Sequence, residues 1–404
     1  MSELRKAIPL ARKKIVDLFI DQCSHGAQVR NLPAGATACG QFLGPNARSL
    51  PQRGIYGTAA ALRVLAEVND ENARALVRKL VHYIQHRESI ETSIDQQNEG
   101  SIKAKCRLDE RNVLKLSDIL HALSCVKHGA AETDEVKTRL VRQLQDGRIE
   151  DRGWGYFTGD QEPELIPTAY AIRALTSLGG YDVSGPSKYL LSSLNSGNGV
   201  ARKNMDIMIN VLVLFALTFS GGSSINQDDL ERLFDPLWRL LEPLLHNDLE
   251  QNIEYWHGSE NLYVRIPWQL YLLSLAAKIR PRRLGSKAAQ ERSQSIVASV
   301  MNAGFLYPHS GKMLSSRTNA IVYETLGILG HGLNYPRLLP VYLFDVSRSA
   351  MSTKTATVVA CLTTATLAVY SIAQWSRGTG KMADLAPNIL WSIMLGLMTL
   401  RKSR

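Results

Sequence analysis

Apolar residues recur along most of the chain at the three- and four-residue spacing that is typical of amphipathic helices. The clearest example is the stretch over residues 152–178, RGWGYFTGDQEPELIPTAYAIRALTSL. Its Gly-Trp-Gly start predicts a tight turn with an anchored aromatic side chain, and a polar loop then leads to Pro167, which favours the first turn of a helix. Ile172, Leu175 and Leu178 fall on one face of that helix. A Gly-Gly pair ends it.

Six helices of this kind are predicted, each rich in alanine or strongly apolar and each paired with a more amphipathic helix. An amphipathic helix over roughly residues 3–22 and a long polar loop over 24–55 precede them. The sequence therefore predicts an all-α protein whose helix pairs recur every 40–60 residues or so, as in helical repeats. The six inner-type helices are expected to begin near Thr58, Ser117, Thr168, Met205, Ile266 and Thr318.

One repeat carries a recognisable motif. Gln145, Gly153 and Trp154 are followed by Thr168 and Ala169 at the start of the Ala-rich helix. This unit resembles a repeat of the α/α-toroid superfamily, which includes terpenoid cyclases of the squalene–hopene type and protein prenyltransferase β subunits. The resemblance covers about one repeat. It implies that six inner and six outer helices close a ring, an (α/α)6 toroid, over residues 1–335.

The catalytic motifs of that superfamily are degenerate in this chain. Class II terpenoid cyclases protonate an alkene with an Asp-x-Asp-Asp motif immediately before Thr-Ala, where this chain has Glu164-Leu165-Ile166-Pro167. The sequence contains neither an Asp-Asp-x-x-Asp motif nor the ligand spacing of a prenyltransferase zinc site. We therefore favour a protein without catalysis, and expect no cofactor and no metal. For an enzyme, the candidate acids are Glu164, Asp118, Asp206 and Glu324.

The composition predicts a basic protein that faces the cytosol. The formal net charge of +10 favours contact with an anionic membrane or an anionic ligand, and no nucleic acid is expected. Five scattered cysteines show no disulfide or zinc spacing, which indicates reduced thiols. The N-terminus lacks the pattern of a signal peptide.

The C-terminal end has a different pattern. Residues 355–375 form a run of about 21 residues without a charge, enough to span a bilayer. Residues 385–400 form a second apolar run of about 16 residues, which is adequate as the return limb of a hairpin. The sequence thus predicts a linker over 336–353 and a transmembrane hairpin with a basic tail over 354–404. Basic residues on both sides of the hairpin place the toroid and both termini in the cytoplasm of a multi-pass cell-membrane protein. The alternative is a pair of buried core helices.

Candidate ligand-binding residues are those expected at the starts of the inner helices and in their loops. Arginine gives two-pronged contacts to anions and aromatic rings give stacking faces, so together they favour an anionic or planar ligand. The candidates are Arg53, Tyr56, Lys115, Tyr170, Lys203, Tyr263, Arg265, Trp268, Arg317 and Tyr323.

Three functions remain open. The favoured one is a membrane-anchored, non-catalytic toroid that binds a ligand or partner in its ring, alone or as a homo-oligomer. A sensing domain joined to a terminal two-span hairpin resembles, in architecture only, membrane effectors of bacterial antiviral defence. The first alternative is a membrane-bound isoprenoid cyclase or prenyltransferase, whose cavity should be apolar and aromatic. The second is a membrane scaffold for protein–protein interaction.

Overall fold

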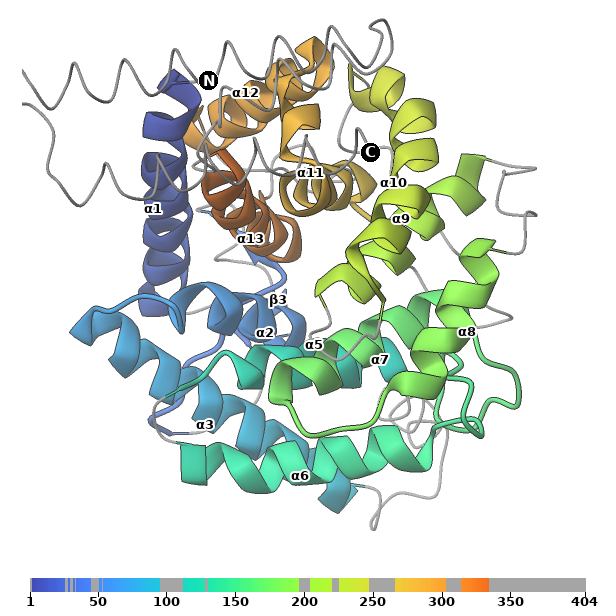
Figure 1. Cartoon of the computed structure of the whole chain (residues 1–404). Coiled ribbons are helices and arrows are strands. Elements are labelled where there is room, and N and C mark those ends of the chain that lie inside the picture. The colour runs from blue at the N-terminus through green and yellow to red at the C-terminus, as the bar shows by residue number, and fades with distance from the viewer. Residues whose placement is uncertain are drawn as a thin grey trace, which may run out of the picture. The chain divides into compact units, whose positions relative to one another are not determined.

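The computed structural model describes residues 2–25, 28–29, 32, 34–44, 51–52, 54–94, 112–127, 130–195, 204–219, 225–246, 266–302 and 314–333. All of them belong to the first of two compact units, Met1–Asn334, and most are helical (Figure 1). The second unit, Tyr335–Arg404, lies outside the described residues, as do the predicted linker and transmembrane hairpin. Within the described ranges, no helix is both long enough and apolar enough to cross a membrane.

Six buried helices form the interior of the first unit. Each contacts the next in chain order, and the last contacts the first, so their contacts make a closed cycle (Figure 1). They are largely apolar because most of their described positions are buried; in the first, only Tyr56 is not. All six predicted inner helices are present, with starts within four residues of the expected positions. They are α2 (Gly54–Leu65), α5 (Val113–Ser124), α7 (Leu165–Leu178), α9 (Asn204–Phe219), α11 (Trp268–Ile279) and α13 (Ser316–Leu333).

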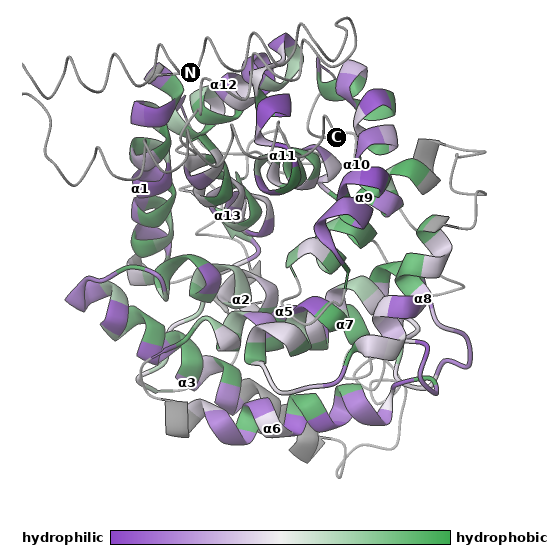
Figure 2. Ribbon diagram, in the orientation of Figure 1, coloured by the Kyte–Doolittle hydropathy of each residue, from purple (hydrophilic) through white to green (hydrophobic). Residues whose placement is uncertain are grey.

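A second set of helices packs on the outside of these six. Helix α3 contacts α2, α6 contacts α5, α8 contacts α7, and α10 contacts both α9 and α11, while α1 contacts α13, α2 and α12. Hydrophilic residues are frequent along these helices (Figure 2). They are α1 (Ser2–His25), α3 (Glu71–Ile94), α6 (Ala130–Asp146), α8 (Ser184–Asn195), α10 (Gln227–Leu241) and α12 (Lys287–Asn302), with short 3-10 turns η2 (Glu242–His246) and η4 (Pro281–Gly285).

Two short strand contacts join neighbouring inner helices in the same way. Phe157, in the loop before α7, pairs antiparallel with Asn112, whose side chain caps the start of α5. Phe42, in the segment before α2, pairs antiparallel with Ser315, whose hydroxyl caps the start of α13. The junction between α13 and α2 therefore repeats the junction between α5 and α7. The strands are β1 (Gln28–Val29), β2 (Phe42–Leu43), β3 (Pro51–Gln52) and β4 (Leu314–Ser315), and β1 pairs parallel with β3.

The turn before α7 holds the anchored tryptophan that its sequence predicts. The Trp154 side chain is fully buried, and its Nε1 donates a hydrogen bond of 2.6 Å to the Leu144 carbonyl. Its backbone amide donates to the Thr168 hydroxyl (2.9 Å), which in turn donates to the Trp154 carbonyl (3.1 Å). Gly153 has a φ of 148°, and a Cβ there would lie 2.4 Å from the Thr168 hydroxyl. Only glycine fits this close approach of turn and helix.

The segment before α2 repeats part of this arrangement. The Cys39 amide donates to the Thr58 hydroxyl (3.1 Å), as the turn before α7 does to Thr168. Each of these threonines opens a run of the form Thr-Ala-x-Ala-(Leu/Ile)-Arg, which ends at Arg63 in α2 and at Arg173 in α7. The two arginines therefore occupy equivalent positions in two copies of one structural unit.

Candidate functional site

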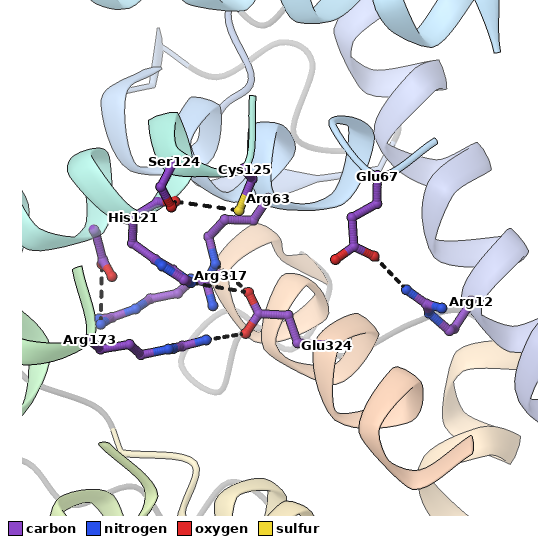
Figure 3. A network of polar contacts seen from close by, with 10 residues as sticks. Arg12, Arg63, Glu67, His121, Ser124, Cys125, Arg173, Arg317 and Glu324 are labelled. Carbon is purple, nitrogen blue, oxygen red and sulfur yellow. Dashed lines mark hydrogen bonds and ion pairs between the residues drawn. The ribbon is translucent and has the colours of Figure 1, made fainter. Parts of the chain in front are cut away.

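Four charged or titratable side chains from four inner helices meet in the interior of the first unit (Figure 3). The Glu324 carboxylate of α13 accepts from Arg63 Nε of α2 at its Oε1 (2.6 Å) and from Arg173 Nη2 of α7 at its Oε2 (2.6 Å). His121 of α5 lies with its Nε2 3.9 Å from the Glu324 Oε1. These four residues are called the Glu324 cluster below.

The two arginines keep Glu324 ionised. Burial by itself raises the pKa of Glu324, but Arg63 and Arg173 outweigh it and hold that pKa well below its ordinary value of 4.5. Burial likewise lowers the pKa of Arg63, and the attraction of Glu324 more than reverses this. The Arg63 side chain is only 4% exposed and that of Glu324 17%, so this charge pair is largely buried but still reached by solvent on the Glu324 side.

His121 is neutral at pH 7. Burial lowers its pKa well below the ordinary 6.5, and the positive charges of Arg173 and Arg63 lower it further, against the smaller opposing effect of Glu324. Its Nδ1 is buried and has no hydrogen-bond partner among the described residues. The imidazole therefore contributes a neutral polar group next to two guanidinium groups.

A second polar group lies on the same inner helices, nearer their N-terminal ends. Arg317 of α13 lies 3.3 Å from the Asp118 carboxylate of α5, measured from Nη2 to Oδ2, and donates from Nη2 to the Tyr170 hydroxyl of α7 (2.9 Å). Burial and the neighbouring Tyr170 raise the pKa of Tyr271 on α11 well above its ordinary value. The Tyr271 phenol therefore stays protonated, and both tyrosines add hydroxyl groups to the interior.

Both groups connect helices that are not neighbours in the cycle. Helix α13 lies between α11 and α2, yet its Glu324 reaches Arg173 of α7, and its Arg317 reaches Asp118 of α5 and Tyr170 of α7. Three guanidinium groups meet two carboxylates in these two groups, so the described side chains of the two groups together carry one excess positive charge. This is a charged and partly aromatic interior, unlike the apolar cavity that a carbocation requires.

Of the residues that the sequence singled out, Arg317, Tyr170 and Asp118 meet in the second polar group, and Glu324 lies in the Glu324 cluster. Tyr323 lies elsewhere, under the Arg12 guanidinium at 4.0 Å from its ring centroid. Glu164 precedes α7 at its N-cap position without a side-chain cap hydrogen bond. Tyr56 is half-buried, whereas Lys115 and Trp268 are fully buried. Arg53, Lys203, Tyr263 and Arg265 lie outside the described residues, and so does the side chain of Asp206.

Sequence reasoning missed Arg63, His121 and Arg173. Each is an isolated polar residue inside an otherwise apolar, alanine- or leucine-rich helix, in the runs TAAALRVL, SDILHALS and TAYAIRAL. A charge on a helix that is apolar all round must be buried and therefore needs a partner. This pattern identifies all three residues, but they lie inside the helices, whereas binding residues were expected at helix starts and in loops.

A pocket in the described part of the chain is not lined by these groups. It has a volume of about 430 Å³ and takes its apolar lining from Leu65, Val77, Val81 and Val126, with Arg78 and others at its edge. No member of the Glu324 cluster lines it. The candidate site therefore rests on its charged groups and their geometry.

Comparison with known proteins gives no family model and no curated protein that matches this chain.

Proposed function

We propose that the first unit is an (α/α)6 toroid of the kind expected from the sequence. The closed cycle of contacts among α2, α5, α7, α9, α11 and α13 supports it. The repeated strand junction adds weight, because the contact that closes the cycle, between Phe42 and Ser315, has the same form as the contact between Phe157 and Asn112 inside it. A ring built from repeats requires its closing junction to resemble its internal ones.

The function that follows best from the site is non-catalytic binding of an anionic small molecule inside this ring. The observation that carries the proposal is the convergence of three arginines, Arg63, Arg173 and Arg317, which pair with two carboxylates among the described residues. Guanidinium groups hold carboxylates and phosphates through paired hydrogen bonds, and the phenols of Tyr170 and Tyr271 add further polar contacts.

The alternative of an isoprenoid cyclase gains little from this geometry. Such an enzyme needs an acid that stays protonated until it meets the alkene, which requires a raised pKa. The pKa of Glu324 is lowered instead, by two arginines within hydrogen-bond distance. Asp118 is ion-paired with Arg317 at 3.3 Å rather than standing free in an apolar cavity.

The output of the ring is proposed to act at a membrane. Helix α13, which carries both Glu324 and Arg317, is the last helix of the first unit, and the apolar runs over 355–375 and 385–400 follow it in the sequence. A ligand that changes the contacts of α13 is therefore placed to act on the C-terminal hairpin. This is the arrangement that a membrane effector of antiviral defence, or another ligand-gated membrane protein, would need.

Two experiments on the full-length chain test the proposal. Native mass spectrometry of the detergent-extracted protein is expected to show a co-purifying anion that is lost in an Arg63→Gln/Arg173→Gln variant. A bound isoprenoid instead would favour the enzyme.

Membrane fractionation is expected to leave the wild type in the pellet after an alkaline wash, and to release a Leu362→Lys/Leu367→Lys variant. Full release of the wild type would refute the membrane hairpin.

A further inference from the structure

The Glu324 carboxylate bridges two arginines at the point where the proposed ring would bind an anion. Its two carboxylate oxygens each accept one hydrogen bond of 2.6 Å, from Arg63 and from Arg173 (Figure 3). The arginines come from equivalent positions of two repeated units, so the fold presents a matched pair of cations to one point. A carboxylate from the chain itself bridges that pair, as the carboxylate or phosphate of a ligand would.

Hydrogen-bonding capacity remains around that point. Arg63 is 4% exposed, and its Nη2 is buried without a hydrogen-bond partner among the described residues, as is Nε of Arg317. Buried guanidinium nitrogens without partners are costly, which marks them as groups that a ligand can satisfy. The Glu324 and Arg173 side chains are 17% and 16% exposed, so the bridge is not sealed from solvent.

We propose that Glu324 is a resident counter-anion, and that a phosphate group of the ligand displaces it from Arg63 and Arg173. This inference rests on the proposed binding function and names the chemistry of the ligand. A phosphate group carries about 1.5 to 2 negative charges at pH 7 and three acceptor oxygens. It therefore offsets most or all of the charge of the two guanidinium groups after Glu324 has left, and its third oxygen can accept from Arg63 Nη2. A carboxylate would only repeat what Glu324 already provides.

The exchange also explains how binding reaches the rest of the chain. Glu324 ties α13 to α2 and, across the ring, to α7. Its displacement removes these ties, and among the described residues α13 is then held across the ring by Arg317, through Asp118 and Tyr170. The helix that precedes the second unit is thus the one that phosphate binding releases.

The test compares phosphate affinity in the full-length, detergent-extracted protein. Melting temperature is followed as inorganic phosphate is titrated in, with sodium chloride at matched ionic strength as the reference, since a ligand of the folded state raises it. Glu324→Gln removes the internal competitor and is expected to bind phosphate about tenfold more tightly than the wild type or better. Adding Arg173→Gln to that variant is expected to abolish the phosphate response.

The chain offers a matched control in Glu67, which pairs with Arg12 at 2.7 Å beside the cluster (Figure 3). Its carboxylate lies 49% exposed and binds only one arginine of the described residues, so Glu67→Gln should leave phosphate affinity at the wild-type value. Titration with a short-chain phosphatidic acid distinguishes the source of the phosphate. A response to this lipid well above that to inorganic phosphate identifies a lipid headgroup, and an equal or smaller response identifies a free phosphate compound.

Equal phosphate affinity in the wild type and in Glu324→Gln would overturn the exchange, and so would a phosphate response that survives Arg173→Gln. These results differ from a failure of the proposed function. A carboxylate ligand found by native mass spectrometry, without any phosphate response, would refute the exchange and leave the proposed binding of an anion intact. A ring that contains no ligand and shows no phosphate response in any variant would refute both the exchange and the proposed function.

Discussion

Removing the charge of Glu324 should destabilise the protein far more than removing an equivalent charge at its surface. In Glu324→Gln the side chain keeps its shape, but Arg63, 4% exposed, and Arg173, 16% exposed, lose their only carboxylate among the described residues. Leaving a buried charge uncompensated costs about 3–5 kcal/mol. We expect a loss of that size in the free energy of unfolding.

The measurement is urea unfolding of the full-length protein in detergent, followed by far-UV circular dichroism, in chloride buffer without phosphate. Glu67→Gln serves as the reference, because its pair with Arg12 is exposed and such pairs contribute only about 0–1 kcal/mol. A difference in unfolding midpoint between the two variants, at an unchanged slope, reports the cost of the buried charge alone.

A rescue variant separates lost attraction from lost packing. Replacing the whole group with apolar residues, Arg63→Met/Arg173→Met/Glu324→Leu, removes the stranded charges as well as the bridge. Buried ion pairs replaced in this way are often neutral in stability or better, so most of the loss should be recovered. A Glu324→Gln variant as stable as Glu67→Gln would refute the reasoning, because the cluster would then not be a buried charge network.

Three further predictions concern the turn before α7 and the cluster's histidine. Gly153→Ala should lower the free energy of unfolding by about 2 kcal/mol or more, because the φ of 148° and the Thr168 hydroxyl, 2.4 Å from a Cβ at this position, exclude a side chain. Gly159→Ala in the same loop is the control: its Cβ would meet nothing within 4 Å, so the same urea assay should show a change of less than about 0.5 kcal/mol. Trp154→Phe leaves a buried carbonyl without its 2.6 Å hydrogen bond and should cost about 1–3 kcal/mol, a figure that an unchanged unfolding midpoint would contradict. The pKa of His121 is lowered in the folded protein, so below pH 6.5 the unfolded chain binds a proton at this residue that the folded chain does not bind. The free energy of unfolding should therefore fall by up to about 1.4 kcal/mol for each pH unit below 6.5, and His121→Gln should lack this component.

Helical periodicity was enough to predict the inner helices, and the reason lies in their burial. A helix covered on all sides must be apolar over its whole length, so segments such as the one that became α9 stand out from their neighbours. The turn around Trp154 was equally predictable, because glycine and a large aromatic residue have few roles at such a position. The short strands were not predicted. The pair of Phe42 with Ser315 joins residues far apart in sequence, and two-residue strands leave no periodic pattern.

The partners in the Glu324 cluster could not be predicted for a related reason. A repeated unit places the same residue at the same position, and here it places Arg63 and Arg173 where both face one point. Two like charges that converge in a buried interior are unstable unless an acid from a different position offsets them. Glu324 provides that acid, and nothing in its own helix indicates that it faces two arginines rather than one. The same repetition that makes the fold predictable thus brings two positive charges together, and Glu324, which offsets part of that charge, is the residue that phosphate would replace in the proposed exchange.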